Sequence, residues 1–119
     1  MANATMRDIS GRNGHLANMR AFTGNSLSGH MVPAGRYYGG YGQLPANYRT
    51  MLADAIERGD VVYMVRSYQT PIAWVIMADS GQLAIVPDVR YSVTTSRHQG
   101  AARAWLAYPT QSVNQVMVG

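Results

Sequence analysis

The chain has 119 residues and a formal net charge of +4, with ten arginines, no lysine and six acidic residues. This length corresponds to one domain. The absence of cysteine excludes disulfides, zinc–cysteine sites, iron–sulfur clusters and a thiol nucleophile. The apolar runs are far shorter than the roughly 20 residues of a transmembrane helix, and the chain does not open with the pattern of a secretory signal.

Residues 1–43 differ in composition from the rest of the chain. They contain eight of the twelve glycines and four arginines against the single acid Asp8, a net charge of +3, whereas residues 44–119 carry +1. A segment rich in Gly, Asn and Ser, with little apolar periodicity, cannot bury enough surface to offset its ordering entropy. We therefore predict a mobile tail over residues 1–20 and an irregular basic segment over residues 21–43 that drapes over a folded body.

A helix is predicted from Pro45 to Arg58. Its apolar residues recur at the spacing of one helical face; they are Tyr48, Met51, Leu52, Ala55 and Ile56. Proline suits the first position of a helix, because its missing N–H would have no partner there. Gly59 is a suitable C-terminal stop.

Four strands and a second helix are expected after this helix. The strands are β-branched or apolar runs bounded by turn residues; they span residues 61–65, 72–77, 83–86 and 89–94. Their connections are too short for parallel crossovers, so neighbouring strands must be antiparallel. Thr95 or Ser96 would cap the second helix, which runs to about Ala107.

These elements predict an α+β fold, with a small antiparallel sheet of three to four strands packed by two helices, beside the irregular basic N-terminal segment. The apolar face of the sheet is expected to meet both helices, because neither can leave its apolar stripe in water. The compact domain would span residues 44–108 and a C-terminal tail residues 109–119. Such a core is small, so a homo-oligomer is one way to complete it.

The richest polar run lies around the expected start of the second helix. It contains Tyr91, Thr94, Thr95, Ser96, Arg97 and His98. Free N–H groups at a helix start attract anions, and an arginine can form two parallel hydrogen bonds to a phosphate. The run therefore predicts a phosphate or nucleic-acid site. The alternative is an ordinary helix cap followed by a solvated face.

Two further segments add candidate binding residues. Tyr68 and Thr70 lie in the turn between the first two strands and would join the same site if that turn lies beside the helix start. Arg36 and Tyr37 begin a Tyr- and Gly-rich run suited to stacking on bases and neutralising phosphate. The alternatives are a proline turn covered by a tyrosine, and a loop whose tyrosines pack on the body. The dispersed histidines and the absence of nucleotide-binding motifs predict no metal and no cofactor.

Two blocks of the sequence resemble a small uncharacterised protein family. They read SYQTPIAW over residues 67–74 and VPDVRYSVTTSRHQ over residues 86–99, and FTGNS over residues 22–26 resembles the start of the same family. The resemblance covers roughly residues 21–107. The family is known from tailed phages of actinobacteria and from haloarchaeal genomes, so the resemblance implies a phage or prokaryotic origin. It gives no catalytic assignment, because the family has no established activity.

Three classes of function fit these patterns. The first is a binding protein that engages nucleic acid or another phosphate-bearing polyanion and modulates a host or phage process. The second is a metal-independent endoribonuclease, in which His98 is the general acid or base and Arg97 stabilises the transition state. The third is a virion component or a protein that binds a host or phage protein. We favour the first class, without a cofactor and in the cytoplasm of the host cell, with the virion as the alternative location.

Overall fold

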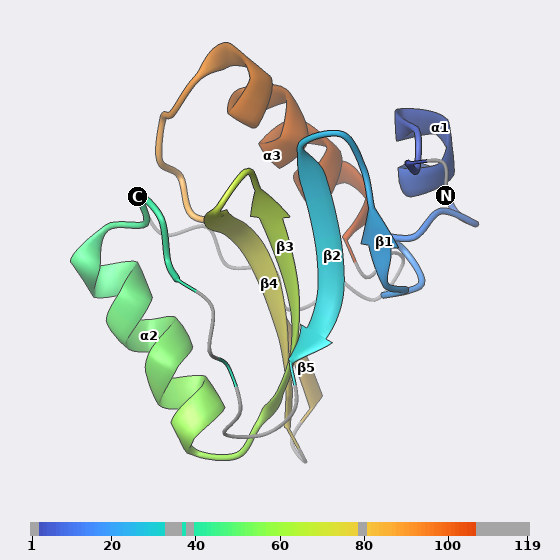
Figure 1. Cartoon of the computed structure of the whole chain (residues 1–119). Coiled ribbons are helices and arrows are strands. Elements are labelled where there is room, and N and C mark those ends of the chain that lie inside the picture. The colour runs from blue at the N-terminus through green and yellow to red at the C-terminus, as the bar shows by residue number, and fades with distance from the viewer. Residues whose placement is uncertain (1–2, 33–36, 38–39, 79–80, 107–119) are drawn as a thin grey trace.

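Figure 1 shows the computed structural model of the chain, which describes residues 3–32, 37, 40–78 and 81–106. The elements in chain order are α1 (Met6–Ile9), β1 (Phe22–Thr23), β2 (Leu27–Val32), α2 (Ala46–Glu57), β3 (Val61–Ser67), β4 (Thr70–Ala78), β5 (Gly81–Ile85) and α3 (Val93–Trp105). The predicted α+β class is confirmed. Within the described residues there are five strands and three helices, so the prediction of three to four strands and two helices was too low.

The five strands form one antiparallel meander in the order β1-β2-β3-β4-β5. Each strand pairs with its neighbours in sequence; for example, Met64 of β3 lies opposite His30 of β2 and Trp74 of β4. A register shift between Val65 and Arg66 interrupts the pairing of β3 with β4 near the end of β3. The predicted antiparallel pairing is therefore confirmed, and it follows from connections too short for a parallel crossover.

Strands β1 and β2 come from the segment that was predicted to be irregular. Leu27, Gly29 and Val32 of β2 are buried. A Cβ atom on Gly29 would lie 2.5 Å from both the Phe22 ring and the Tyr63 hydroxyl, so only glycine fits this close approach. Glycine and the polar residues of β2 give a weak local strand signal. Pairing with β3, and not local preference, makes this segment a strand.

Both faces of the sheet are buried. Val62 and Met64 of β3 pack on one face in a cluster with Leu52 of α2. Tyr63 and Val65 pack on the other face in a second cluster, which includes residues of α3. The two helices thus cover opposite faces (Figure 1), and the expectation that both pack on one apolar face was wrong. The apolar runs of β3 and β4 lack polar alternation, as is typical of strands buried on both sides.

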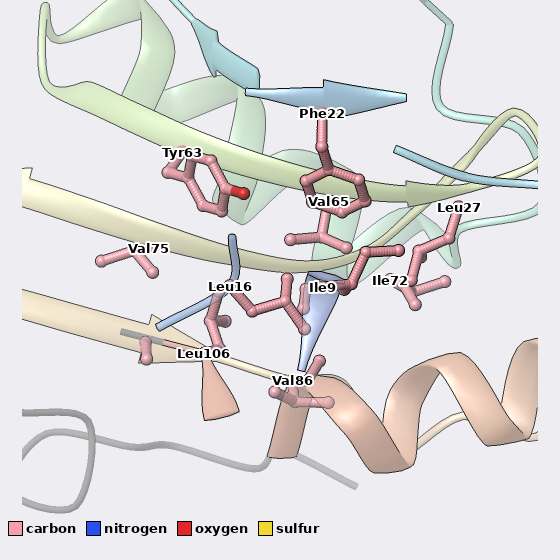
Figure 2. Close-up of a cluster of buried hydrophobic side chains, with 13 residues drawn as sticks. Ile9, Leu16, Phe22, Leu27, Tyr63, Val65, Ile72, Val75, Val86 and Leu106 are labelled. Carbon is pink, nitrogen blue, oxygen red and sulfur yellow. The ribbon is translucent and has the colours of Figure 1, made fainter. Parts of the chain in front are cut away.

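Residues 3–20 fold onto the body, contrary to the predicted mobile tail. Thr5 and Asp8 form a reciprocal capping box at the start of α1. Ile9 and Leu16 are only 1% and 0% exposed, and Figure 2 shows them among side chains of β3, β4 and the C-terminal end of α3. The Tyr63 hydroxyl donates a hydrogen bond to the Arg20 carbonyl at 2.7 Å. A domain boundary near residue 43 would therefore divide one core.

Other sequence expectations concern the second half of the chain. Trp74 is fully buried, and Trp105 is partly buried against the cluster on the α3 face. The predicted C-terminal tail, residues 109–119, lies outside the described residues. Among the helices that the structure describes, none combines the length and the apolar character required to cross a bilayer.

We expect Leu16→Ala to lower the free energy of unfolding by about 2–5 kcal/mol, because it would leave a cavity in the core. Met6→Ala changes a side chain of the same segment that is 44% exposed, and it should change stability by less than about 0.5 kcal/mol. Urea unfolding of both variants measures the difference. If residues 3–20 did not pack on the body, the two variants would unfold at the same urea concentration as the wild type.

Candidate functional site

Helix α3 begins earlier than the sequence predicted. Ser92 is its N-cap and Val93 its first residue, whereas the prediction placed the cap at Thr95 or Ser96 and a strand over residues 89–94. The β-branched pair of Val93 and Thr94 favoured that strand. The Ser92 hydroxyl instead accepts the Thr95 N–H at 3.1 Å, which satisfies one of the free donors of the first turn.

The early start of α3 brings its first turn against the β3–β4 turn. Ser92 Oγ donates to Thr95 Oγ1 at 3.1 Å. Ser67 Oγ, at the end of β3, lies 3.1 Å from Thr95 Oγ1 and 2.8 Å from His98 Nδ1. These four side chains form a continuous chain of hydrogen bonds between two segments that are distant in sequence, and we call it the hydroxyl chain.

A neutral His98 ring can accept the hydrogen bond at the end of the hydroxyl chain. Burial lowers the pKa of His98 below its ordinary value of 6.5, so the imidazole is neutral at pH 7. With Ser92 donating to Thr95, Thr95 can donate to Ser67, and Ser67 to His98 Nδ1. The ring proton of His98 is then on Nε2.

A cavity of about 220 Å³ lies beside the hydroxyl chain and is lined by Gln43, Ser67, Tyr68, Thr70, Tyr91, Ser92 and Thr95. All seven of these side chains are polar and uncharged. Thr70 Oγ1 accepts the Gln43 N–H at 2.9 Å. The Tyr91 hydroxyl is buried and has no hydrogen-bond partner, and burial followed by the neighbouring Tyr48 raises its pKa. An unpaired buried donor costs free energy, so the Tyr91 hydroxyl is an unfavourable feature of the packing beside this cavity.

The other predicted residues of α3 do not join this cavity. Thr94, Ser96 and Arg97 are exposed and are not among its lining residues. His98 is buried and faces Ser67 instead. Arg97 and His98 therefore occupy different surroundings, and the structure does not assemble them into one reaction centre.

The other candidate binding residues lie in two separate places, the β3–β4 turn and the segment around Tyr37. Tyr68 lines the cavity with a positive φ of 56°, and its side chain is 62% exposed. Tyr37 is partly buried against the α2 cluster, and its hydroxyl donates to the Gly40 carbonyl. This packing favours the alternative in which that tyrosine covers the body. Arg36 lies outside the described residues.

A second candidate site lies where the N-terminal segment folds onto β1 and β2. Two adjoining cavities, of about 440 and 950 Å³, share Asp8 and His15 and together form what we call the N-terminal groove. The smaller cavity is lined by three arginines, Arg7, Arg12 and Arg20, and the larger by His30 and Arg66.

The N-terminal groove is positively charged. Its lining contains four arginines and one acid, which gives +3 with neutral histidines. The acid, Asp8, accepts hydrogen bonds from the backbone N–H and the hydroxyl of Thr5. The Thr5 backbone and side-chain hydrogen bonds, and then His15 and Arg7, hold the pKa of Asp8 below its ordinary value. This carboxylate is engaged in capping α1, so the groove retains a net attraction for anions.

Two buried polar atoms in the groove have no hydrogen-bond partner. They are His15 Nδ1 and Arg66 Nε. The His15 ring stacks on Phe22 with the ring centroids 5.4 Å apart, which leaves the imidazole little freedom to turn toward another partner. Burial, and then the charge of Arg66, lowers the pKa of His30. Such unpaired buried atoms are uncommon in folded proteins.

This groove was not predicted from the sequence. Two signals pointed toward it: the net charge of +3 in residues 1–43, and the Thr5-x-x-Asp8 spacing of a capping box. The segment lacks apolar periodicity, so the burial of Ile9 and Leu16 in the core could not be predicted from its pattern. Among the described residues, no three His, Asp or Glu side chains are grouped so that they could hold a metal ion.

The chain matches a known protein family. A family model described as "Family of unknown function (DUF8033)" matches residues 13–106. No curated protein and no solved structure matches the chain significantly. The matched residues include the hydroxyl chain and part of the N-terminal groove, but not Arg7, Asp8 or Arg12.

We expect the stability of the protein to decrease as the pH falls below about 6.5, the pKa of an exposed histidine. Burial lowers the pKa of His98 and of His30 in the folded chain. Between the ordinary value and the lowered values the unfolded chain therefore binds more protons, which favours unfolding.

His98→Gln should make this decrease shallower without removing it, because His30 still titrates. Thermal unfolding followed between about pH 5 and 8 measures the slope, with His30→Gln as the matched variant. An unchanged slope in His98→Gln would contradict the lowered pKa of His98.

Proposed function

The chain belongs to this family of unknown function, and we propose that it binds the phosphate backbone of a nucleic acid in its N-terminal groove. The observation that carries the proposal is the excess of four arginines over one engaged carboxylate along a single groove. Phosphate contacts by arginine provide most of the affinity of sequence-independent nucleic-acid binding.

Two arginines outside the groove have acidic partners. Arg58 forms an ion pair with Asp60 at 2.9 Å, and Arg103 lies 3.8 Å from Asp88. Arg7 and Arg12 are exposed, and Asp8, the single acid among the residues that line their cavity, accepts hydrogen bonds from Thr5 and also attracts Arg7. Their guanidinium groups are therefore available for bidentate contacts with phosphate oxygens.

The backbone of the groove also supports this role. Arg20 donates to the Asn13 carbonyl, and Asn18 donates to the carbonyls of Arg12 and Gly14. These contacts hold residues 12–20 in one conformation and reduce the entropy cost of binding. Arg66 lines the larger cavity and extends the positive surface toward β2 and β3. Its Nη2 donates to the Gln69 carbonyl, and its Nε has no partner.

This proposal replaces the start of α3 as the main phosphate site. The cavity there contains no charged lining residue, and Arg97 is exposed outside it. A polyanion needs several separated cations along its backbone, and the N-terminal groove supplies them.

The resemblance to proteins of actinobacterial phages and haloarchaea suggests the setting of this function. We propose that the protein acts in the host cytoplasm during infection and modulates a host or phage process through the nucleic acid it binds. A host or phage protein, or a second copy of the chain, would be a further partner in that process.

We expect Arg7→Ala/Arg12→Ala to weaken binding of a fluorescent single-stranded oligonucleotide. The binding constant K falls with salt, and each lost phosphate contact should make the slope of log K against log salt less steep by roughly 0.7 for a single strand. Fluorescence anisotropy measured between about 50 and 200 mM salt gives this slope. Duplex DNA and heparin, tested alongside, show whether the site accepts other polyanions.

The matched control is Arg49→Ala/Arg97→Ala, which removes the same charge from exposed positions on α2 and α3. This control should bind nearly as well as the wild type. Equal losses in both double variants would mean that only net charge matters, and unchanged binding in Arg7→Ala/Arg12→Ala would overturn the proposed site.

A further inference from the structure

We propose that Ser67 and His98 are a nucleophile and general base that cleave small uncharged acyl esters in the cavity at the start of α3. This inference is independent of the N-terminal groove, because no residue lines both places. It rests on the hydrogen bond between the two side chains, on the hydroxyl chain that orients it and on the chemistry of the cavity wall.

The distance between Ser67 Oγ and His98 Nδ1 is 2.8 Å, within the range that allows a base to take the proton of a serine nucleophile. Ser67 is 2% exposed, and it is one of the residues that line the cavity in which a substrate would lie. His98 is 8% exposed, and in the tautomer with the ring proton on Nε2 its Nδ1 accepts from Ser67. The pair therefore has the protonation state that a general base requires.

The hydroxyl chain determines which way the hydroxyl proton of Ser67 points. Thr95 Oγ1 lies 3.1 Å from both Ser67 Oγ and Ser92 Oγ. When Thr95 donates to Ser67, the hydroxyl proton of Ser67 must point to His98. A lone pair of Ser67 Oγ then remains for attack on a carbonyl carbon in the cavity.

The cavity wall indicates the class of substrate. Its lining residues, within the part of the chain that the structure describes, are all uncharged, and its volume is about 220 Å³. A phosphate diester would find no cation there, whereas a short neutral acyl group fits both size and polarity.

The reaction requires only the ester and water. Ser67 Oγ attacks the acyl carbon while its proton passes to His98 Nδ1. The bond between the acyl carbon and the alcohol oxygen then breaks, and His98 returns the proton to the leaving alcohol. Water attacks the acyl-serine, His98 again accepts and returns a proton, and the carboxylic acid leaves with Ser67 restored.

Burial of His98 opposes formation of the imidazolium, since a charged ring in this position loses hydration. The described residues place no carboxylate in hydrogen-bond contact with His98 to offset that cost. The turnover should therefore be slow, and covalent labelling of Ser67 is a more sensitive measurement than product release.

The experiment treats the full chain with a small, uncharged fluorophosphonate probe and identifies the modified residue by mass spectrometry of peptides. We expect a single adduct on Ser67. His98→Gln should slow labelling by roughly 100-fold, the contribution of a general base. Ser96→Ala, an exposed hydroxyl on α3 outside the cavity, should be labelled at the rate of the wild type.

Peptide mapping of the wild-type adduct needs no variant, so the test does not depend on whether Ser67→Ala folds. Absence of an adduct, or an adduct on another residue, would overturn the proposal. Labelling of folded His98→Gln at the wild-type rate would show that His98 is not the base. The variant Arg7→Ala/Arg12→Ala should be labelled normally, which separates this proposal from the nucleic-acid groove.

Discussion

The antiparallel pair of β3 and β4 is the constraint on which the rest of the structure depends. Four consecutive residues of β3, from Val62 to Val65, are fully buried, as are Ile72 to Val75 of β4. Strands with apolar side chains on both faces need a covering layer on each side. The described part of the chain has two helices of more than one turn, α2 and α3. Each of them covers one face of the sheet.

The layer on the α3 face needs more than a helix. Ile9, Leu16 and Phe22 pack on this face in one cluster with strand residues and with residues of α3. The N-terminal segment therefore folds because the sheet gives its few apolar residues a surface to bury. Its polar and basic residues then remain on the outside, and they form the N-terminal groove as a consequence of that packing.

The two candidate sites differ in electrostatics, and so they suit different chemistry. The groove is open and positively charged, which favours an extended polyanion. The cavity beside α3 is small and uncharged, and its hydroxyl groups are oriented by one another. Ser67 belongs to the β3–β4 pair itself, so the same hairpin that organises the core also positions the end of the hydroxyl chain.

Local patterns in the sequence were sufficient for several elements. The spacing of Tyr48, Leu52 and Ile56 indicated α2, and the β-branched runs indicated β3 and β4, because these segments bury the residues that their own periodicity selects. Short connections were enough to predict antiparallel pairing. The predicted site required the β3–β4 turn to lie beside the start of α3. The contacts of Ser67 with Thr95 and His98 show that the two segments meet.

Tertiary structure alone decided the rest. Strand β2 contains Ser28, Gly29 and His30, whose local preferences do not favour a strand, and it exists because β3 offers an edge for pairing. Ser92 is the cap of α3, although Thr95 and Ser96 were equally suitable by residue type. Residues 3–20 have too few apolar side chains to fold alone, so their structure depends on a surface formed by residues more than 40 positions away. Periodicity reports contacts within an element, and it carries no information on such distant packing.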